Sequence, residues 1–197
     1  MPALGAVLVG GTSSRFGSDK SRAEFNGRSL LMHQAETLVG AGVQEVVYVG
    51  GEPRSEVPAA LRHVPDHREG TAARDRSMLL GIISALAEAG RLGCDKACVL
   101  ACDVPLVRSG TLLRLLDACS TSDIAVGSCD GDHWSILALR TESFERLLAR
   151  FTSGVRAVYE AVEELRVARI QLDDLEATNV NDVETLRSIS PRFDTRK

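Results

Sequence analysis

Short apolar runs alternate with longer amphipathic stretches along most of this chain. The runs have strand length and end at glycine or polar residues, whereas the stretches repeat apolar positions at helical spacing. Strands are expected at residues 3–9, 45–49, 62–64, 97–101, 124–127, 135–139 and 167–172. Helices are expected at residues 29–41, 78–88, 111–119, 142–151, 155–165 and 182–188. Repeated strand–helix units predict an α/β fold: a single Rossmann-like, three-layer domain with a mainly parallel central sheet and helices on both faces.

Composition fits a small enzyme with one core. The 197 residues are 44% hydrophobic and 25% charged, so we expect one domain over residues 1–190 and a loose polar tail at 191–197. A net charge of −4 gives no basic surface for nucleic acid. No apolar run has the length of a membrane span or a signal peptide. We therefore expect a cytoplasmic monomer.

Five cysteines are present, and an odd number without a secretory signal argues against a disulfide framework. The spacing of Cys94, Cys98 and Cys102 invites a metal-site interpretation. However, Cys98 and Cys102 flank apolar residues of an expected strand, where cysteine is an ordinary small buried side chain. We favour the buried interpretation.

The glycine-rich stretch at residues 8–20, Leu-Val-Gly-Gly-Thr-Ser-Ser-Arg-Phe-Gly-Ser-Asp-Lys, follows the first expected strand. Glycines let consecutive backbone N–H groups turn toward an anion. Arg15 and Lys20 add full positive charges, and arginine grips phosphate through two donors. This loop is predicted to hold a polyphosphate at the end of a strand.

The loop matches neither common phosphate motif, because Lys20 does not follow a glycine and no G-x-G-x-x-G is present. It resembles the nucleotidyltransferase superfamily pattern Leu-Ala-Gly-Gly-x-Ser-x-Arg-Met-Gly-x-Asp-Lys. Val9 stands where that pattern has Ala, and Phe16 where it has Met.

Asp103 follows the expected strand at 97–101 and should lie at the same sheet edge as the glycine-rich loop. A carboxylate there would repel phosphate by about 4 kcal/mol at 4 Å and an effective dielectric near 20. Mg²⁺ reverses that sign because it takes carboxylate and phosphate oxygens together. Asp103 is thus predicted to be a Mg²⁺ ligand, and the Asp-Val-Pro sequence also resembles the superfamily's metal motif.

The stretch at residues 178–186, Thr-Asn-Val-Asn-Asp-Val-Glu-Thr-Leu, resembles the closing segment of the same superfamily. Asn181 has two possible roles there. Its amide oxygen could complete the Mg²⁺ shell, or it could cap the last helix, since asparagine is a favoured N-cap. The sequence leaves both roles open.

Together these motifs resemble the molybdenum cofactor guanylyltransferases (the molybdopterin-guanine dinucleotide biosynthesis protein A type) over nearly the whole chain. Residues 130–136 resemble the family's Asp-Gly-x-x-x-His-Pro region, although the proline is missing and the region is shorter. Residues 154–156 resemble its Gly-x-Arg segment. On this resemblance, the side facing the acceptor pterin would include His133, Arg156 and Asn179.

The resemblance implies the roles of the remaining residues. Catalysis would involve Arg15, Lys20 and Asp103, with Mg²⁺ held by Asp103 and Asn181. The nucleotide would lie along a set of strand-end residues: Leu8, Val9, Gly10, Gly11, Ser13, Lys20, Asp66 and Asp103.

Two departures fall on the base-recognition side. Gly51 stands where the family has an asparagine that helps to bind guanosine, and residues 77–81 lack the Gly and Pro of the family's Gly-Pro-Leu-x-Gly. These departures put the identity of the base in doubt and leave the transfer chemistry intact.

The implied activity is transfer of GMP from GTP to the phosphate of molybdenum-bound molybdopterin, with transient contact to the enzymes that accept the cofactor. Two alternatives remain. One is another nucleotidyltransferase, which loads CTP onto the pterin or acts on a sugar phosphate. The other is a non-catalytic nucleotide- or cofactor-binding module, which has no need of Asp103.

Overall fold

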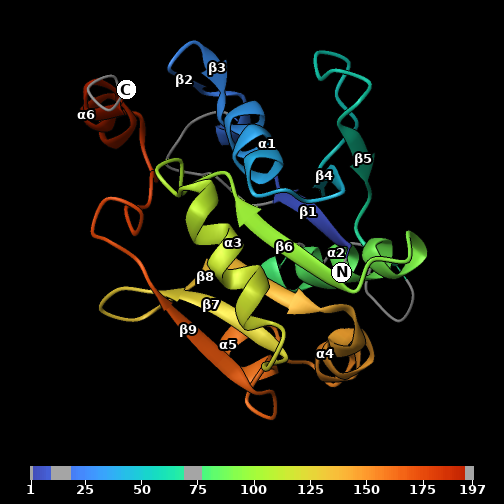
Figure 1. Ribbon diagram of the computed structural model, residues 1–197. Coiled ribbons are helices and arrows are strands. Elements are labelled where there is room, and N and C mark those ends of the chain that lie inside the picture. The colour runs from blue at the N-terminus through green and yellow to red at the C-terminus, as the bar shows by residue number, and fades with distance from the viewer. Residues whose placement is uncertain (1, 10–18, 69–76, 194–197) are drawn as a thin grey trace.

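The computed structural model describes residues 2–9, 19–68 and 77–193. Seven strands form one sheet in the order β5-β4-β1-β6-β8-β7-β9 (Figure 1). The strands are β1 (Ala3–Leu8), β4 (Glu45–Val49), β5 (Arg62–Val64), β6 (Lys96–Ala101), β7 (Ile124–Ser128), β8 (Asp132–Arg140) and β9 (Val167–Gln171). The α-helices are α1 (Leu30–Gly40), α2 (Met78–Arg91), α3 (Ser109–Ala118), α4 (Phe144–Thr152), α5 (Val158–Ala161) and α6 (Val183–Phe193). The expected α/β fold class is confirmed.

Parallel pairing dominates the sheet but does not extend across all of it. Strands β5, β4, β1 and β6 are parallel neighbours, and β7 pairs in parallel with β9. Strand β8 lies between β6 and β7 and is antiparallel to both. The sheet is therefore mixed and mostly parallel.

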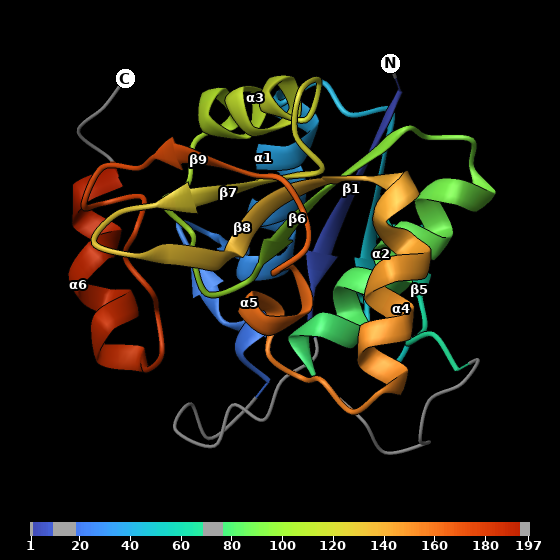
Figure 2. The same ribbon diagram turned by 90° about the horizontal axis from the view of Figure 1, so that it is seen from below.

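Two apolar layers sandwich the sheet because successive strand residues face opposite sides. Along β1, Leu4, Ala6 and Leu8 face the layer that includes α2, α4 and α5, whereas Ala3 and Val7 face the layer that includes α1, α3 and α6. Figure 2 shows α3 on one side of the sheet and α4 and α5 on the other. This is the three-layer arrangement that the sequence predicts.

Most predicted elements appear within a few residues of their expected bounds, and the exceptions have local causes. The helix expected at 155–165 shrinks to α5. Val155 precedes α5 and Val162 ends it, and β-branched valine is a weak helix former. Helix α6 continues to Phe193, past the expected end at 188 and into the segment expected to be a loose tail.

The sequence pattern did not predict a small antiparallel hairpin of β2 (Glu24–Phe25) and β3 (Arg28–Ser29). Its Asn26–Gly27 turn has φ of 51° and 77°, which is the backbone that Asn-Gly favours in tight hairpins. Its strands have two residues each and are too short for an alternating pattern. A short 3₁₀ helix, η1 (Lys20–Arg22), precedes it, and a second, η2 (Thr141–Ser143), precedes α4.

Within the residues described, no helix is long and apolar enough to cross a membrane.

Candidate functional site

The carboxyl ends of four parallel strands meet in one row. Leu8 pairs in register with both Val49 and Ala101, and Val49 pairs with Val64. Beyond this row the Val9 N–H still donates to the Val49 carbonyl at 3.0 Å. Residues that directly follow these strands therefore share one edge, which is where open α/β sheets bind ligands.

The turn that carries Asp103 is braced by α1. Gln34, fully buried in α1, donates its amide to the carbonyls of Ala101 at 3.0 Å and Val104 at 2.9 Å. The His33 Nε2 atom lies 2.8 Å from the Pro105 carbonyl. Burial lowers the pKa of His33, which favours the neutral ring in this structural contact. These contacts fix the backbone on both sides of Asp103.

Lys20 brings a positive charge to the same edge. Asp19 caps η1, since its carboxylate accepts a hydrogen bond from the Ser21 N–H at 3.2 Å. The Lys20 ammonium then donates to Asn181 Oδ1 at 3.1 Å and lies 3.9 Å from Asp103 Oδ2. The side chains of Asp103 and of Asn181, which is 161 positions from Lys20 in sequence, thus converge on one ammonium group.

Asp103 is an incompletely satisfied carboxylate. Its Oδ1 atom is buried and has no hydrogen-bond partner among the described residues. Burial raises the pKa of Asp103, and the Lys20 ammonium partly offsets that rise. Because an unpaired buried polar atom costs free energy, this oxygen is expected to be present for a ligand rather than for stability.

The segment that carries Asn181 is tied to the Asp103 turn. The Val180 N–H donates to the Asp103 carbonyl at 2.7 Å. Farther back, the buried Glu176 carboxylate accepts hydrogen bonds from the Thr111 hydroxyl at 2.6 Å and the Arg108 N–H at 3.1 Å. The segment is therefore anchored to the start of α3.

The two roles left open for Asn181 can now be separated. Asp182 caps α6, because its carboxylate accepts the Thr185 N–H at 2.7 Å, the usual N-cap geometry. Asn181 does not supply that cap, and its Oδ1 atom faces the Lys20 ammonium instead.

Oxygen atoms of Asp103 and Asn181 would suit a hard cation. Lys20 already places a positive charge beside both side chains, and Asp103 has a buried oxygen to spare. The described residues include no cluster of three or more His, Cys, Asp or Glu side chains suited to a metal. A cation held here would therefore draw its other ligands from phosphate and water, as Mg²⁺ commonly does.

The other predicted nucleotide contacts are placed in part. Leu8 is the buried last residue of β1, and Val9, the next residue, is partly buried. Asp66 is half-buried, two residues past the end of β5. Four predicted residues lie outside the described residues: Gly10, Gly11, Ser13 and Arg15.

The three residues predicted on the acceptor side come from three separate segments of the chain. His133 Nε2 lies 3.1 Å from the Cys129 carbonyl in the β7–β8 hairpin. Arg156 donates to the Phe151 carbonyl at 2.7 Å, and its guanidinium lies 4.0 Å from the centre of the Phe151 ring. Asn179 is exposed and lies two positions before Asn181 in the sequence.

The departures on the base side have structural explanations. Gly51 has a φ of +64°, and a Cβ there would lie 3.6 Å from Val9 and 3.9 Å from the Arg54 guanidinium, which are ordinary contacts. Ser77 caps α2 by accepting the Leu80 N–H at 3.2 Å, so Met78 occupies the first helical position. Proline is also favoured at that position, so both sequences start a helix.

Two residues that hold the site in place, Gln34 and Arg54, were not identified from the sequence. Gln34 falls among the apolar positions of α1, and a polar residue in such a stripe signals a buried hydrogen bond. Arg54 lies in the loop after β4, where no local pattern marks it, yet its side chain is only 5% exposed.

The cysteines are buried as expected, apart from the half-buried Cys129. Cys98 and Cys102 belong to the apolar layer that contains α1 and α3. Burial raises the pKa of both thiols far above the usual range, which disfavours the thiolate that metals bind.

Known proteins resemble this chain in sequence and fold. A probable molybdenum cofactor guanylyltransferase of Bacillus cereus (strain Q1) is 27% identical over 187 residues, 91% of this chain and 92% of that protein. One of Opitutus terrae is 34% identical over 122 residues, but the match spans only 58% of that protein and 62% of this chain.

The fold resembles that in the crystal structure of molybdopterin-guanine dinucleotide biosynthesis protein A from Archaeoglobus fulgidus. The TM-score is 0.77 at 19% identity, over 97% of this chain and 98% of that one. The MobA-like NTP transferase domain matches residues 5–167, which is most of the sequence. The chain therefore belongs to the MobA-like NTP transferase family.

Proposed function

We propose that this protein transfers GMP from GTP to the phosphate of molybdenum-bound molybdopterin and releases pyrophosphate. The observation that carries the proposal is the convergence of Lys20, Asp103 and Asn181 at the carboxyl edge of the sheet. Family membership supports nucleotide transfer. The relatives named molybdenum cofactor guanylyltransferase support the choice of GTP and the pterin.

The proposed reaction is an in-line displacement at phosphorus. A phosphate oxygen of the pterin forms a bond to the α-phosphorus of GTP, and the bond from that phosphorus to the oxygen bridging to the β-phosphate breaks. The electron pair leaves on pyrophosphate. Because the attacking phosphate is already ionised at neutral pH, no general base is needed, and catalysis is positioning plus charge neutralisation.

The chain's own residues supply that neutralisation. Lys20, with Arg15 of the glycine-rich loop, is assigned to the phosphates of GTP and the charge that develops on pyrophosphate. Asp103 and Asn181 would hold Mg²⁺, which supplies charge neutralisation at the phosphate oxygens when bound. The buried, unpartnered Asp103 oxygen fits this role. Gln34 and His33 hold the Asp103 turn in place.

A pyrophosphate-release assay tests the proposal. The full chain is incubated with each of four NTPs, with and without Mg²⁺, and with the molybdenum-bound pterin, a sugar phosphate or no acceptor. Asp103→Asn serves as the catalytically impaired control. Release that requires GTP, Mg²⁺ and the pterin together is expected. Release with CTP instead would assign a cytidylyl transfer, and release with a sugar phosphate would assign that acceptor. Metal-independent nucleotide binding without pyrophosphate release would overturn the enzyme assignment and support a binding module.

A further inference from the structure

Arg54 joins the loop after β4 to the turn that carries Lys20. Its guanidinium pairs with the Asp19 carboxylate, Nη2 to Oδ2, at 2.9 Å, and donates through Nη1 to the Ser21 hydroxyl. The Arg54 N–H donates to the Tyr48 hydroxyl at 3.0 Å, and the guanidinium lies 5.8 Å from the centre of the Tyr48 ring. One side chain therefore binds the residues on both sides of Lys20 and anchors them to the end of β4.

Burial makes this connection stronger than an ordinary surface ion pair. The Arg54 side chain is 5% exposed and Ser21 is 2% exposed, while the Asp19 side chain is 40% exposed. Arg22 lies 3.7 Å from the Asp19 carboxylate and 2.8 Å from that of Glu56, but the side chains of Arg22 and Glu56 are 59% and 49% exposed. Exposed pairs contribute little because water and salt screen them.

Arg54 also balances the charge of Asp19. The buried Cys102 thiol lies within the electrostatic reach of Asp103, Arg54, Asp19 and Lys20, so two cations and two anions gather at this edge. Without Arg54, the Asp19 carboxylate would stand next to Lys20 with less compensation. An uncompensated anion at that place would repel a triphosphate.

We propose that Arg54 is a positioning residue for Lys20. It clamps the turn at residues 19–21 against the end of β4 and neutralises Asp19, so that the Lys20 ammonium is held beside Asp103 and Asn181. The benefit to catalysis rests on the proposed nucleotidyl transfer, whereas the clamp itself is a property of the folded chain.

Lysine acetylation measures the clamp without any turnover. The sequence has three lysines, Lys20, Lys96 and Lys197, and the buried Lys96 provides an internal reference. Full-length wild type, Arg54→Met, Arg54→Lys and the matched control Arg22→Met are treated with N-hydroxysuccinimidyl acetate at one pH. Mass spectrometry then gives the rate of modification at each lysine.

The expected result is faster modification of Lys20 in Arg54→Met by about fivefold, the effect of losing an ion pair worth about 1 kcal/mol. Arg22→Met should react like wild type, and Arg54→Lys should fall between, because an ammonium can pair with Asp19 but lacks the planar fork by which the guanidinium holds Asp19 and Ser21 together. A wild-type rate at Lys20 in Arg54→Met would overturn the clamp. A rise at Lys96 as large as that at Lys20 would also overturn it, since that result means general unfolding.

Steady-state kinetics test the consequence for transfer. In Arg54→Met we expect a lower kcat and a higher KM for GTP, with the KM for the pterin unchanged. Adding Asp19→Asn should return the KM for GTP toward wild type while kcat stays low, because it removes the carboxylate that Arg54 no longer balances but does not restore the clamp. A KM for GTP unmoved by the second substitution would refute the charge-balancing role. If labelling changes as expected while wild type transfers no nucleotide, the proposed function fails and the clamp stands.

Discussion

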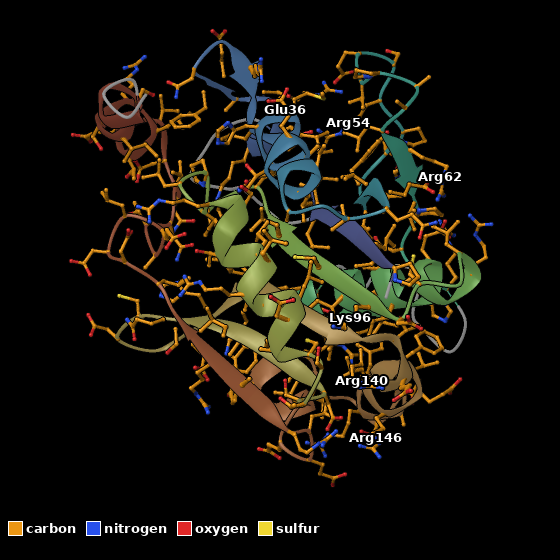
Figure 3. The ribbon with its side chains drawn as sticks, viewed as in Figure 1. Glu36, Arg54, Arg62, Lys96, Arg140 and Arg146 are labelled. Atoms are coloured by element: carbon orange, nitrogen blue, oxygen red, sulfur yellow. The ribbon has the colours of Figure 1, made fainter. Side chains whose placement is uncertain are left out.

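Lys20 and Lys96 are both largely buried, and they lie at opposite ends of the parallel strands. Lys96 begins β6, and its ammonium donates to the Leu116 carbonyl at 2.7 Å and contacts the Ser120 hydroxyl at 3.4 Å. Lys20 lies beyond the other end of β6, where it faces Asn181 and Asp103. Figure 3 shows Lys96 under α3, well apart from Arg54, whose side chain lies beside α1.

Glu88 and Asp103, the carboxylates at the two ends of the strands, differ in how completely they are hydrogen-bonded. Glu88, at the amino end of the strands, accepts hydrogen bonds from Arg91 at 2.7 and 2.9 Å and a further one from Arg62. These bonds, that from Arg91 first, lower the pKa of Glu88, whereas burial raises the pKa of Asp103. Charges whose bonds are complete stabilise the fold, and the buried Asp103 carboxylate with a spare oxygen is the feature on which the proposed ligand site rests.

The largest expected effect is on catalysis at the carboxyl end. Lys20→Met and Asp103→Asn should each lower kcat for pyrophosphate release by about 10²–10³-fold, the usual cost of removing one charge-stabilising group from an active site. Asp103→Asn should be at least as stable as wild type, because it removes the cost of burying a charge. Denaturation curves check the fold, and wild-type turnover by either folded variant would refute these roles.

Lys96→Met should lower the stability of the fold and leave catalysis unchanged. It should lower the free energy of unfolding by about 1–3 kcal/mol, because the carbonyl at the end of α3 loses its donor. Its kcat and KM should match wild type. Urea denaturation and the same kinetic assay check both expectations, and a selective loss of kcat with unchanged stability would erase the contrast between the two lysines.

Glu88→Gln extends the contrast to pH. A folded-state pKa below the unfolded value means that ionised Glu88 stabilises the fold above about pH 4.3, and that this contribution is lost as the pH falls through the folded value. We therefore expect a loss of about 1–2 kcal/mol at pH 7 that shrinks in acid. Urea denaturation at pH 7 and at an acidic pH measures this loss. The exposed Glu36, paired with Arg28, is the control, and an equal loss in Glu36→Gln would contradict the importance of burial.

Gly51→Asn should have the smallest effect, and it should change only the KM for the nucleotide. Asparagine tolerates the left-handed backbone at this position, and among the described residues no atom lies closer than 3.6 Å to its Cβ. One added hydrogen bond should lower the KM for GTP about fivefold and leave that for CTP unchanged. An equal gain for both nucleotides would remove Gly51 from base recognition. Thermal denaturation should match wild type.

The sequence predicted the layers and the meeting of Asp103 and Lys20 at one sheet edge, because both depend on short-range patterns. Apolar runs gave the strands, and Asp103 and Lys20 follow from the positions of their motifs next to strand ends. Arg54 and the cap at Asp182 could not be predicted in this way. Arg54 reaches Asp19 across 35 positions of sequence, and choosing between two adjacent cap residues, Asn181 and Asp182, requires the path of the backbone.

Strand β8 divides the sheet into two parts that can change independently. Because β8 is antiparallel to its neighbours, its first residues, Asp132 and His133, reach the same edge as the last residues of β6 and β7. The hairpin between β7 and β8 can gain or lose residues without altering the register of any parallel strand, since loops of this kind tolerate insertion. If the proposed function holds, a relative built on this sheet could thus acquire a different acceptor while the half that includes β1, β4 and β5 keeps the proposed nucleotide site.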